Sequence, residues 1–121
     1  MQTISMPELA AGETYIATLF DAASQTGQHI ILLDGDNNNA TWEKQKAWAA
    51  SIGGELPTRF EQAMLYAKHK DLFQVNWYWS GEQHAVKSDY AWCQNFGDGY
   101  HAEHADTDFK LRARAVRRLA I

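Results

Sequence analysis

The sequence contains few of the features that define several large classes of protein. Its single cysteine, Cys93, excludes an internal disulfide and is compatible with a reducing cytoplasm. No apolar run is long enough to span a bilayer, and residues 1–8 lack the basic and apolar regions of a signal peptide. The formal net charge of -4 gives no general affinity for nucleic acid or for an anionic membrane. We therefore expect no membrane insertion, no signal peptide and no nucleic-acid partner.

The composition is that of one ordinary globular domain. The chain has 121 residues, of which 45% are hydrophobic and 21% are charged. A chain of this length can bury roughly two thirds of its unfolded surface without the support of a metal or a disulfide. We expect a single domain over residues 1–121, with an N-terminal strand region at 1–39 and the main core at 40–121.

The first half predicts two strands and a helix. Residues 13–20 are rich in β-branched and aromatic side chains, residues 29–33 form a short apolar run, and the polar segment between them favours a hairpin turn. Thr41 is a candidate cap for a helix over residues 42–52, which the pair Gly53-Gly54 then ends.

A second helix follows from a capping box. Thr58 and Glu61 have the spacing of this motif, and the helix they begin runs to about residue 70. Apolar side chains follow at helical spacing and are expected to form its buried face: Phe60, Ala63, Met64 and Ala67.

After Phe73 the pattern changes to strands with frequent turns. Strands are predicted at 75–80 and 90–96, with a polar loop at 81–89, a turn at 97–99 and a last strand at 111–119. Three of the five tryptophans, Trp77, Trp79 and Trp92, fall in this region. Because the helices lie between early and late strands, the fold class is α+β.

Four segments together carry a resemblance to a known family. They are Gly53-Gly54-Glu55-Leu56-Pro57-Thr58-Arg59, Trp77-Tyr78-Trp79-Ser80-Gly81-Glu82, Tyr90 to Gly99, and Leu111 to Arg118. Their order resembles the C-type-lectin-like domains of phage and prophage proteins and of the C-terminus of some bacterial collagen-like adhesins. The resemblance covers residues 40–119. It implies two helices packed on a small mixed or antiparallel β region, with the last strand returning to pair with the first.

Two segments contain residue types that could bind a metal ion. Asp34 begins a run typical of a calcium loop, but Asn39 and Gln45 stand where an EF-hand requires Gly and Glu, so we expect a polar turn at 34–39. The resemblance adds that the triplets of calcium-dependent sugar-binding lectins are missing. The run His101-Ala102-Glu103-His104, followed by two aspartates, lacks the spacing of a zinc motif and is expected to be a solvated loop. We expect no metal and no cofactor.

The remaining candidates favour structural roles. Cys93 in a strand is expected to be a small buried hydrophobe, not a nucleophile. Five of the eleven basic residues lie between Lys110 and Arg118, where they can bind phosphate or pair with carboxylates such as Glu13 and Glu55; the acidic total charge favours pairing. Trp79 and Trp92 are expected to be core residues, although one tryptophan ring could reach a binding face.

The candidate binding surface lies on the loops between the late strands, where polar and aromatic side chains alternate. In lectin-like proteins the corresponding region contacts ligands. The candidate residues are Glu82, Gln83, His84, Ser88, Asp98, Tyr100, His101, Glu103 and His104.

Two functions are expected from the resemblance, and neither is enzymatic. The first is a phage or prophage virion component, on a tail fibre, baseplate or capsid surface, that uses carbohydrate binding or protein binding for host recognition and adhesion. The second is a structural accessory protein, for capsid decoration or oligomerisation, without its own ligand. Both imply phage structural proteins as partners, synthesis in the bacterial host cytoplasm and a homo-oligomer, in which multivalency raises weak affinity.

Overall fold

The structure, a computed structural model, describes residues 5–121. Residues 1–4 lie outside the described residues. They include the beginning of the expected strand region and part of the segment that was expected not to be a signal peptide. The described range is an α+β fold whose elements in chain order are β1 (Thr14–Asp21), β2 (Thr26–Leu32), β3 (Asn37–Ala40), α1 (Trp42–Ser51), α2 (Arg59–His69), the 3-10 helix η1 (Lys70–Leu72), β4 (Trp77–Gln83), β5 (Tyr90–Asn95), β6 (His101–Asp106), β7 (Leu111–Ala113) and β8 (Val116–Ala120). Within residues 5–121, no helix has the length and apolar character needed to cross a membrane.

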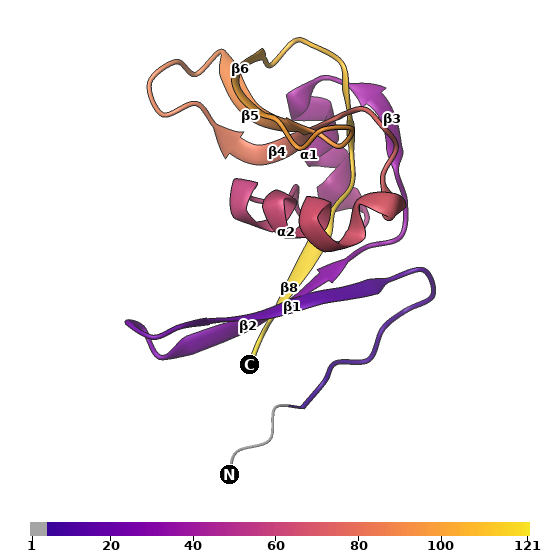
Figure 1. The fold of residues 1–121 in the computed structure, drawn as a ribbon, viewed down its shortest axis with the longest axis vertical. Coiled ribbons are helices and arrows are strands. Elements are labelled where there is room, and N and C mark those ends of the chain that lie inside the picture. The colour runs from indigo at the N-terminus through magenta and orange to yellow at the C-terminus, as the bar shows by residue number, and fades with distance from the viewer. Residues whose placement is uncertain (1–4) are drawn as a thin grey trace.

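The smaller sheet has the order β1-β2-β8 and contains the expected N-terminal hairpin (Figure 1). All its pairs are antiparallel, and the hairpin closes between Asp21 and Thr26. The C-terminal strand β8 does return to the N-terminal strands. The resemblance implied that it would pair with the first strand, but its partner is β2. The reason is burial: Ile30, Ile31 and Leu32 of β2 are buried, and a strand buried in this way takes the central place in a sheet.

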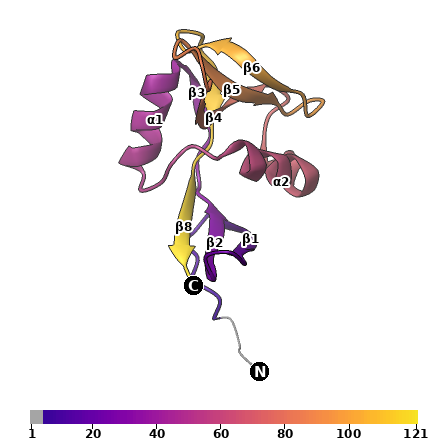
Figure 2. The same ribbon diagram turned by 90° about the vertical axis from the view of Figure 1, so that its left-hand side faces the viewer.

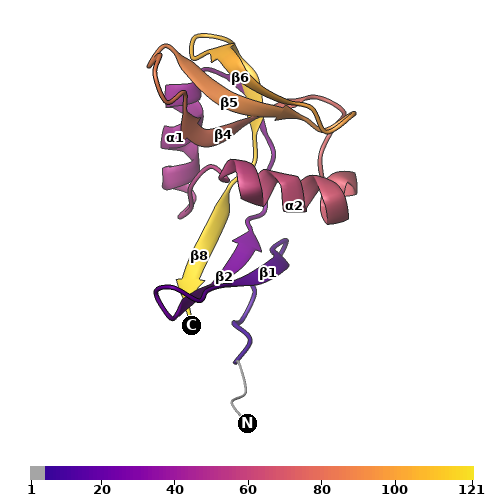
Figure 3. The same cartoon turned by 60° about the vertical axis from the view of Figure 1, so that its left-hand side comes forward.

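The larger sheet has the order β3-β7-β4-β5-β6 and lies between the two helices (Figures 2 and 3). On one face Trp79 and Cys93 pack with Trp42 and Ala49 of α1. On the other face Tyr78 packs with α2 and with side chains of the smaller sheet. Strand β8 runs from the larger sheet to the β1–β2 hairpin, so the C-terminal segment joins the two sheets (Figure 3).

A buried glutamine explains a strand that the sequence did not predict. The segment 34–39 was expected to be a polar turn, but Asn37 begins β3, which pairs with β7. Gln45 of α1 is fully buried; its amide nitrogen donates to the carbonyls of Asn38 and Leu111, each at 2.8 Å, and its amide oxygen accepts from Asn37 at 2.8 Å. This side chain therefore fastens α1, β3 and β7 together, which short polar strands cannot do through apolar packing.

The second helix begins as predicted but buries a different face. Thr58 and Glu61 form the complete capping box. The buried side chains are Glu61, Gln62 and Leu65, whereas Phe60 is 62% exposed, so the prediction of an apolar face through Phe60 was wrong. The physical reason is that Gln62 donates to the carbonyl of Tyr78 at 3.2 Å.

The last predicted strand is divided into two. Between β7 and β8 lies Arg114, a buried residue whose guanidinium donates to the carbonyls of Leu72 at 2.7 Å and Leu33 at 2.8 Å. This interruption lets β7 pair in the larger sheet and β8 in the smaller one.

Two arginines of the basic C-terminal cluster pair with the carboxylates that the structural interpretation predicted. Arg117 binds Glu13 at 2.9 Å, and Arg118 binds Glu55 at 3.2 Å. Arg118 also binds the buried carboxylate of Glu61 at 2.7 Å, a contact that the sequence did not indicate. These arginines fasten β8 to the hairpin and to α2.

Candidate functional site

Two irregularities in the larger sheet meet at Trp92. On one side, Trp79 pairs with Cys93 and Gln83 with Ala91, so residues 80–82 of β4 lie opposite Trp92 alone. On the other side, β6 also has a register shift, and its residues 103–104 lie opposite Trp92. Bulges of this kind redirect side chains and are frequent beside functional sites. They allow side chains from β4 and β6 to converge on one ring.

The indole of Trp92 lies beneath the start of α2. The Arg59 guanidinium carbon is 3.9 Å from the ring centroid. The Glu82 carboxylate accepts from the backbone N–H of Arg59 at 2.6 Å and from its Nε at 3.3 Å. Because Arg59 is the first residue of α2, the helix dipole also favours this carboxylate. The result is an ordered group of an aromatic ring, a cation and an anion at the surface.

These side chains line a surface hollow of about 470 Å³, which we call the Trp92 recess. Its lining is Thr58, Arg59, Phe60, Glu82, Trp92 and His101. The His101 Nδ1 is enclosed and has no hydrogen-bond partner among residues 5–121. Burial, with a smaller effect of the Arg59 charge, lowers the pKa of His101 below its ordinary value, so the imidazole is neutral at pH 7.

A second hollow continues the recess along β6. It measures about 490 Å³, shares Trp92 and His101 with the first, and is also lined by Tyr100, Ala102, Glu103 and His104. The side chain of Tyr100 is 64% exposed, and its ring lies edge-on to Trp77 with 6.2 Å between centroids. The combined surface offers an exposed aromatic ring beside groups that form hydrogen bonds.

The structure brings together most, but not all, of the residues predicted to bind. Glu82, Tyr100, His101, Glu103 and His104 line the two hollows. The segment from His101 was expected to be a solvated loop, but it is β6, whose outward side chains form the site.

The other predicted residues have local roles. His84 approaches His104, with 5.3 Å between ring centroids. Gln83 donates to the carbonyl of Ser88 at 2.7 Å and so closes the 84–89 loop. The Asp98 carboxylate accepts a hydrogen bond from the backbone N–H of Tyr100 at 3.0 Å and so stabilises the turn that precedes β6.

Sequence reasoning missed the contribution of α2. Arg59 and Phe60 were not among the predicted binding residues, although both line the recess. Trp79 and Trp92 were both expected to be largely buried, with the possibility that one tryptophan ring reaches a binding face; Trp79 is 0% exposed, and Trp92 is the partly exposed ring that lines the recess. One sequence signal could have indicated this contribution. The Thr58–Glu61 capping box places Arg59 at the start of a helix, where an exposed Arg side chain can turn back over a neighbouring strand.

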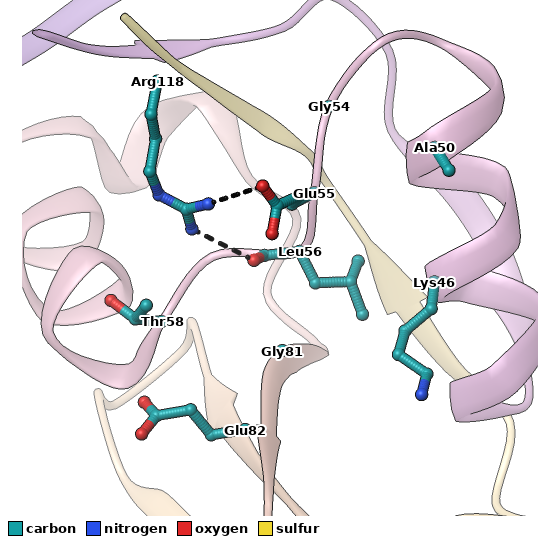
Figure 4. Close-up of a pocket in the computed structure, with 9 residues that line it drawn as sticks. All are labelled: Lys46, Ala50, Gly54, Glu55, Leu56, Thr58, Gly81, Glu82 and Arg118. Atoms are coloured by element: carbon teal, nitrogen blue, oxygen red, sulfur yellow. Dashed lines mark hydrogen bonds and ion pairs between the residues drawn. The ribbon is translucent and has the colours of Figure 1, made fainter. Parts of the chain in front are cut away.

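A groove between the helices has another character (Figure 4). Its volume is about 320 Å³, and Arg118, Glu55, Lys46 and Glu82 are its charged lining residues. Arg118 is held by Glu55 and by the Leu56 carbonyl, while Lys46 and Glu82 lie on opposite sides of the opening (Figure 4). Its arginine is therefore already occupied by internal partners, and we assign this groove a structural role.

A third, apolar hollow of about 320 Å³ lies on the α1 side of the sheet and reaches β6, where it shares Ala102 and His104 with the second hollow. It is lined by Trp77, Cys93, Ala102, His104, Ala105, Phe109 and Leu111. Cys93 is 2% exposed, as predicted for a small buried hydrophobe. Burial raises the pKa of its thiol to about 12, so it is not a thiolate at neutral pH and is a poor nucleophile.

The arrangement at Trp92 is suited to binding through an aromatic surface and fixed polar groups. A neutral imidazole, a paired carboxylate and a paired guanidinium can donate and accept hydrogen bonds without a large change in charge. The sequence matches no protein-family model, and no curated protein matches it either.

Proposed function

We propose that this chain is a non-enzymatic binding module with a C-type-lectin-like fold, a component of a phage or prophage virion that binds a host-surface glycan or protein. The observation that carries the binding proposal is the convergence of Arg59, Glu82 and His101 on Trp92. The order of elements supports the finer fold assignment: a hairpin, two helices, a β-rich half and a final strand that returns to the hairpin.

The chemistry of the recess favours a flat, hydroxyl-rich or amide-rich ligand. Tyr100, in the adjoining second hollow, supplies exposed aromatic area at small cost in conformational entropy. Glu82 and Arg59 already hold each other, so the ligand meets polar groups in fixed positions. A single recess of this kind binds weakly, and a homo-oligomer on the virion surface would raise the avidity.

The test is adsorption of a double variant, Tyr100→Ala with His101→Ala, to host cells and to a glycan array. We expect at least a tenfold loss of binding, while the variant keeps the far-ultraviolet circular dichroism of the unmodified chain. The matched control is Phe20→Ala, which removes an aromatic side chain that is 63% exposed on β1, a strand of the smaller sheet that does not line the recess. Unchanged binding by a folded double variant would contradict the proposed site, and absence of the chain from purified virions, measured by mass spectrometry, would contradict the virion role.

One observation favours the alternative, a structural accessory protein of the particle. Phe109 is 56% exposed and lines the apolar hollow on the α1 side of the sheet. Apolar surface of this kind is typical of contacts between subunits. If Phe109→Asp prevents assembly into the particle while the recess variants have no effect on adsorption, the accessory function is the correct one.

A further inference from the structure

We propose that His84, Glu103 and His104 form a binding site for a divalent transition-metal ion, with Zn²⁺ as the preferred ion. One donor atom from each residue lies within 4.8 Å of the other two. The three residues come from the loop after β4 and from the edge strand β6. The site shares Glu103 and His104 with the second hollow of the proposed binding surface, but it does not rest on the Arg59–Glu82–Trp92 group, so metal binding can be tested separately from glycan or protein binding.

The bulge in β6 is what allows adjacent residues to act together. In a regular strand successive side chains point to opposite faces. Here residues 103–104 share one opposing residue, and the Glu103 carboxylate lies 3.5 Å from Nδ1 of His104. That separation is close to the distance of about 3.3 Å between ligands in a tetrahedral zinc site with bonds of 2.0–2.1 Å. The carboxylate and one imidazole therefore need little movement to share an ion.

The third donor is held beside them by aromatic contacts. The ring of His84 lies 5.3 Å from that of His104, and Tyr90 packs edge-on against both, with centroids 6.1 Å and 5.6 Å away. These contacts limit the freedom of both imidazoles and reduce the entropy lost when an ion binds.

The donor set selects the class of ion. Two imidazoles and one carboxylate suit Zn²⁺ and its neighbours Ni²⁺ and Cu²⁺, whereas Ca²⁺ and Mg²⁺ require oxygen ligands. Three protein donors leave a position for water or for a donor atom of a bound molecule. The side chains of Glu103 and His104 are 44% and 64% exposed, so an ion can reach the site from solvent.

Binding must also change the loop that carries His84. Its Nδ1 accepts hydrogen bonds from the backbone N–H groups of Val86 at 3.1 Å and Lys87 at 3.0 Å. A metal at Nδ1 replaces these bonds. A metal at Nε2 requires a proton on Nδ1, which turns this acceptor into a donor that faces two N–H donors. Either mode releases the two N–H groups, so metal binding is coupled to the 84–89 loop.

The experiment is calorimetric titration of the tag-free chain with Zn²⁺, with Co²⁺ absorption as a probe of coordination and NMR of the Val86 and Lys87 amides as a probe of the loop. We expect one ion per chain, no competition from excess Ca²⁺, and shifts of both amide signals on binding. His84→Ala, Glu103→Gln and His104→Ala should each weaken binding at least tenfold.

The matched control is His69→Ala, which removes a histidine at the end of α2 and should bind as the unmodified chain does. The proposal is overturned by the absence of saturable uptake, by unchanged affinity in folded His84→Ala or His104→Ala, or by unchanged amide signals at saturation. A loss of binding in the His69 control would assign the ion to another histidine and would likewise overturn it.

Discussion

The two tryptophans of the central strands should differ sharply in their contribution to stability. Trp79 is 0% exposed, packs in the α1-side core, and donates from its indole nitrogen to the Ala40 carbonyl at 3.1 Å. Replacing it by alanine leaves a closed cavity and an unpaired carbonyl, so Trp79→Ala should cost about 4–6 kcal/mol. That is a large part of the roughly 5–15 kcal/mol that stabilises a typical domain.

Trp92→Ala should cost much less. The ring is partly exposed, and the Arg59 guanidinium carbon lies 3.9 Å from its centroid. Water fills the space after truncation, so the cavity contribution is small, and the lost transfer and cation–π energies together amount to about 1–3 kcal/mol.

Urea unfolding followed by far-ultraviolet circular dichroism measures both values without relying on tryptophan fluorescence. Trp79→Phe replaces Trp79→Ala if the latter is insoluble; it keeps an aromatic ring, loses the hydrogen bond, and should still be less stable than the unmodified chain. Equal losses for Trp79→Ala and Trp92→Ala, or a larger loss for Trp92→Ala, would refute the assignment of Trp92 to a surface recess.

Two further predictions concern pH and metal ions. Because the pKa of His101 in the folded chain is lowered from 6.5, its neutral form stabilises the fold above pH 6.5, and this contribution is lost as pH falls below that value. The urea midpoint of His101→Gln should therefore fall less between pH 7.5 and pH 5.5 than that of the unmodified chain; equal falls contradict the burial argument. The chain should also fold without Ca²⁺ or Zn²⁺, since its two buried clusters need no ion, so a strong chelator should lower Tm by no more than a few degrees.

The sequence predicted the elements whose signals are local. The capping box of Thr58 and Glu61 fixes the start of α2 through contacts within one turn, and the structure contains both of its hydrogen bonds. The hairpin and the strands around Trp79 were found because alternation and turn residues are also local patterns.

The sequence could not predict the features that depend on distant partners. Strand β3 consists of polar residues, and Gln45 fixes its place by bonding to Asn38 and Leu111. The break before β8 depends on Arg114 finding the carbonyls of Leu72 and Leu33. No pattern of period two or 3.6 contains such information.

The candidate site was predicted in part for the same reason. Tyr100 and His101 were identified because polar and aromatic residues alternate after a turn. Arg59 was missed, since its position over Trp92 depends on the packing of α2 against β5. Likewise, His84 is distant in sequence from Glu103, and only the pairing of β4, β5 and β6 brings them together.

The most direct test of the central claim is amide hydrogen exchange of the chain with and without envelope glycans or surface proteins extracted from host cells. The proposed binding function requires slower exchange on binding at residues 98–104 of β6 and its preceding turn and at residues 58–60 of α2, with no change in the β1–β2 hairpin. Protection confined to the hairpin, or no protection at a saturating concentration of the extract, would contradict the proposal that the Trp92 recess binds a host-surface molecule.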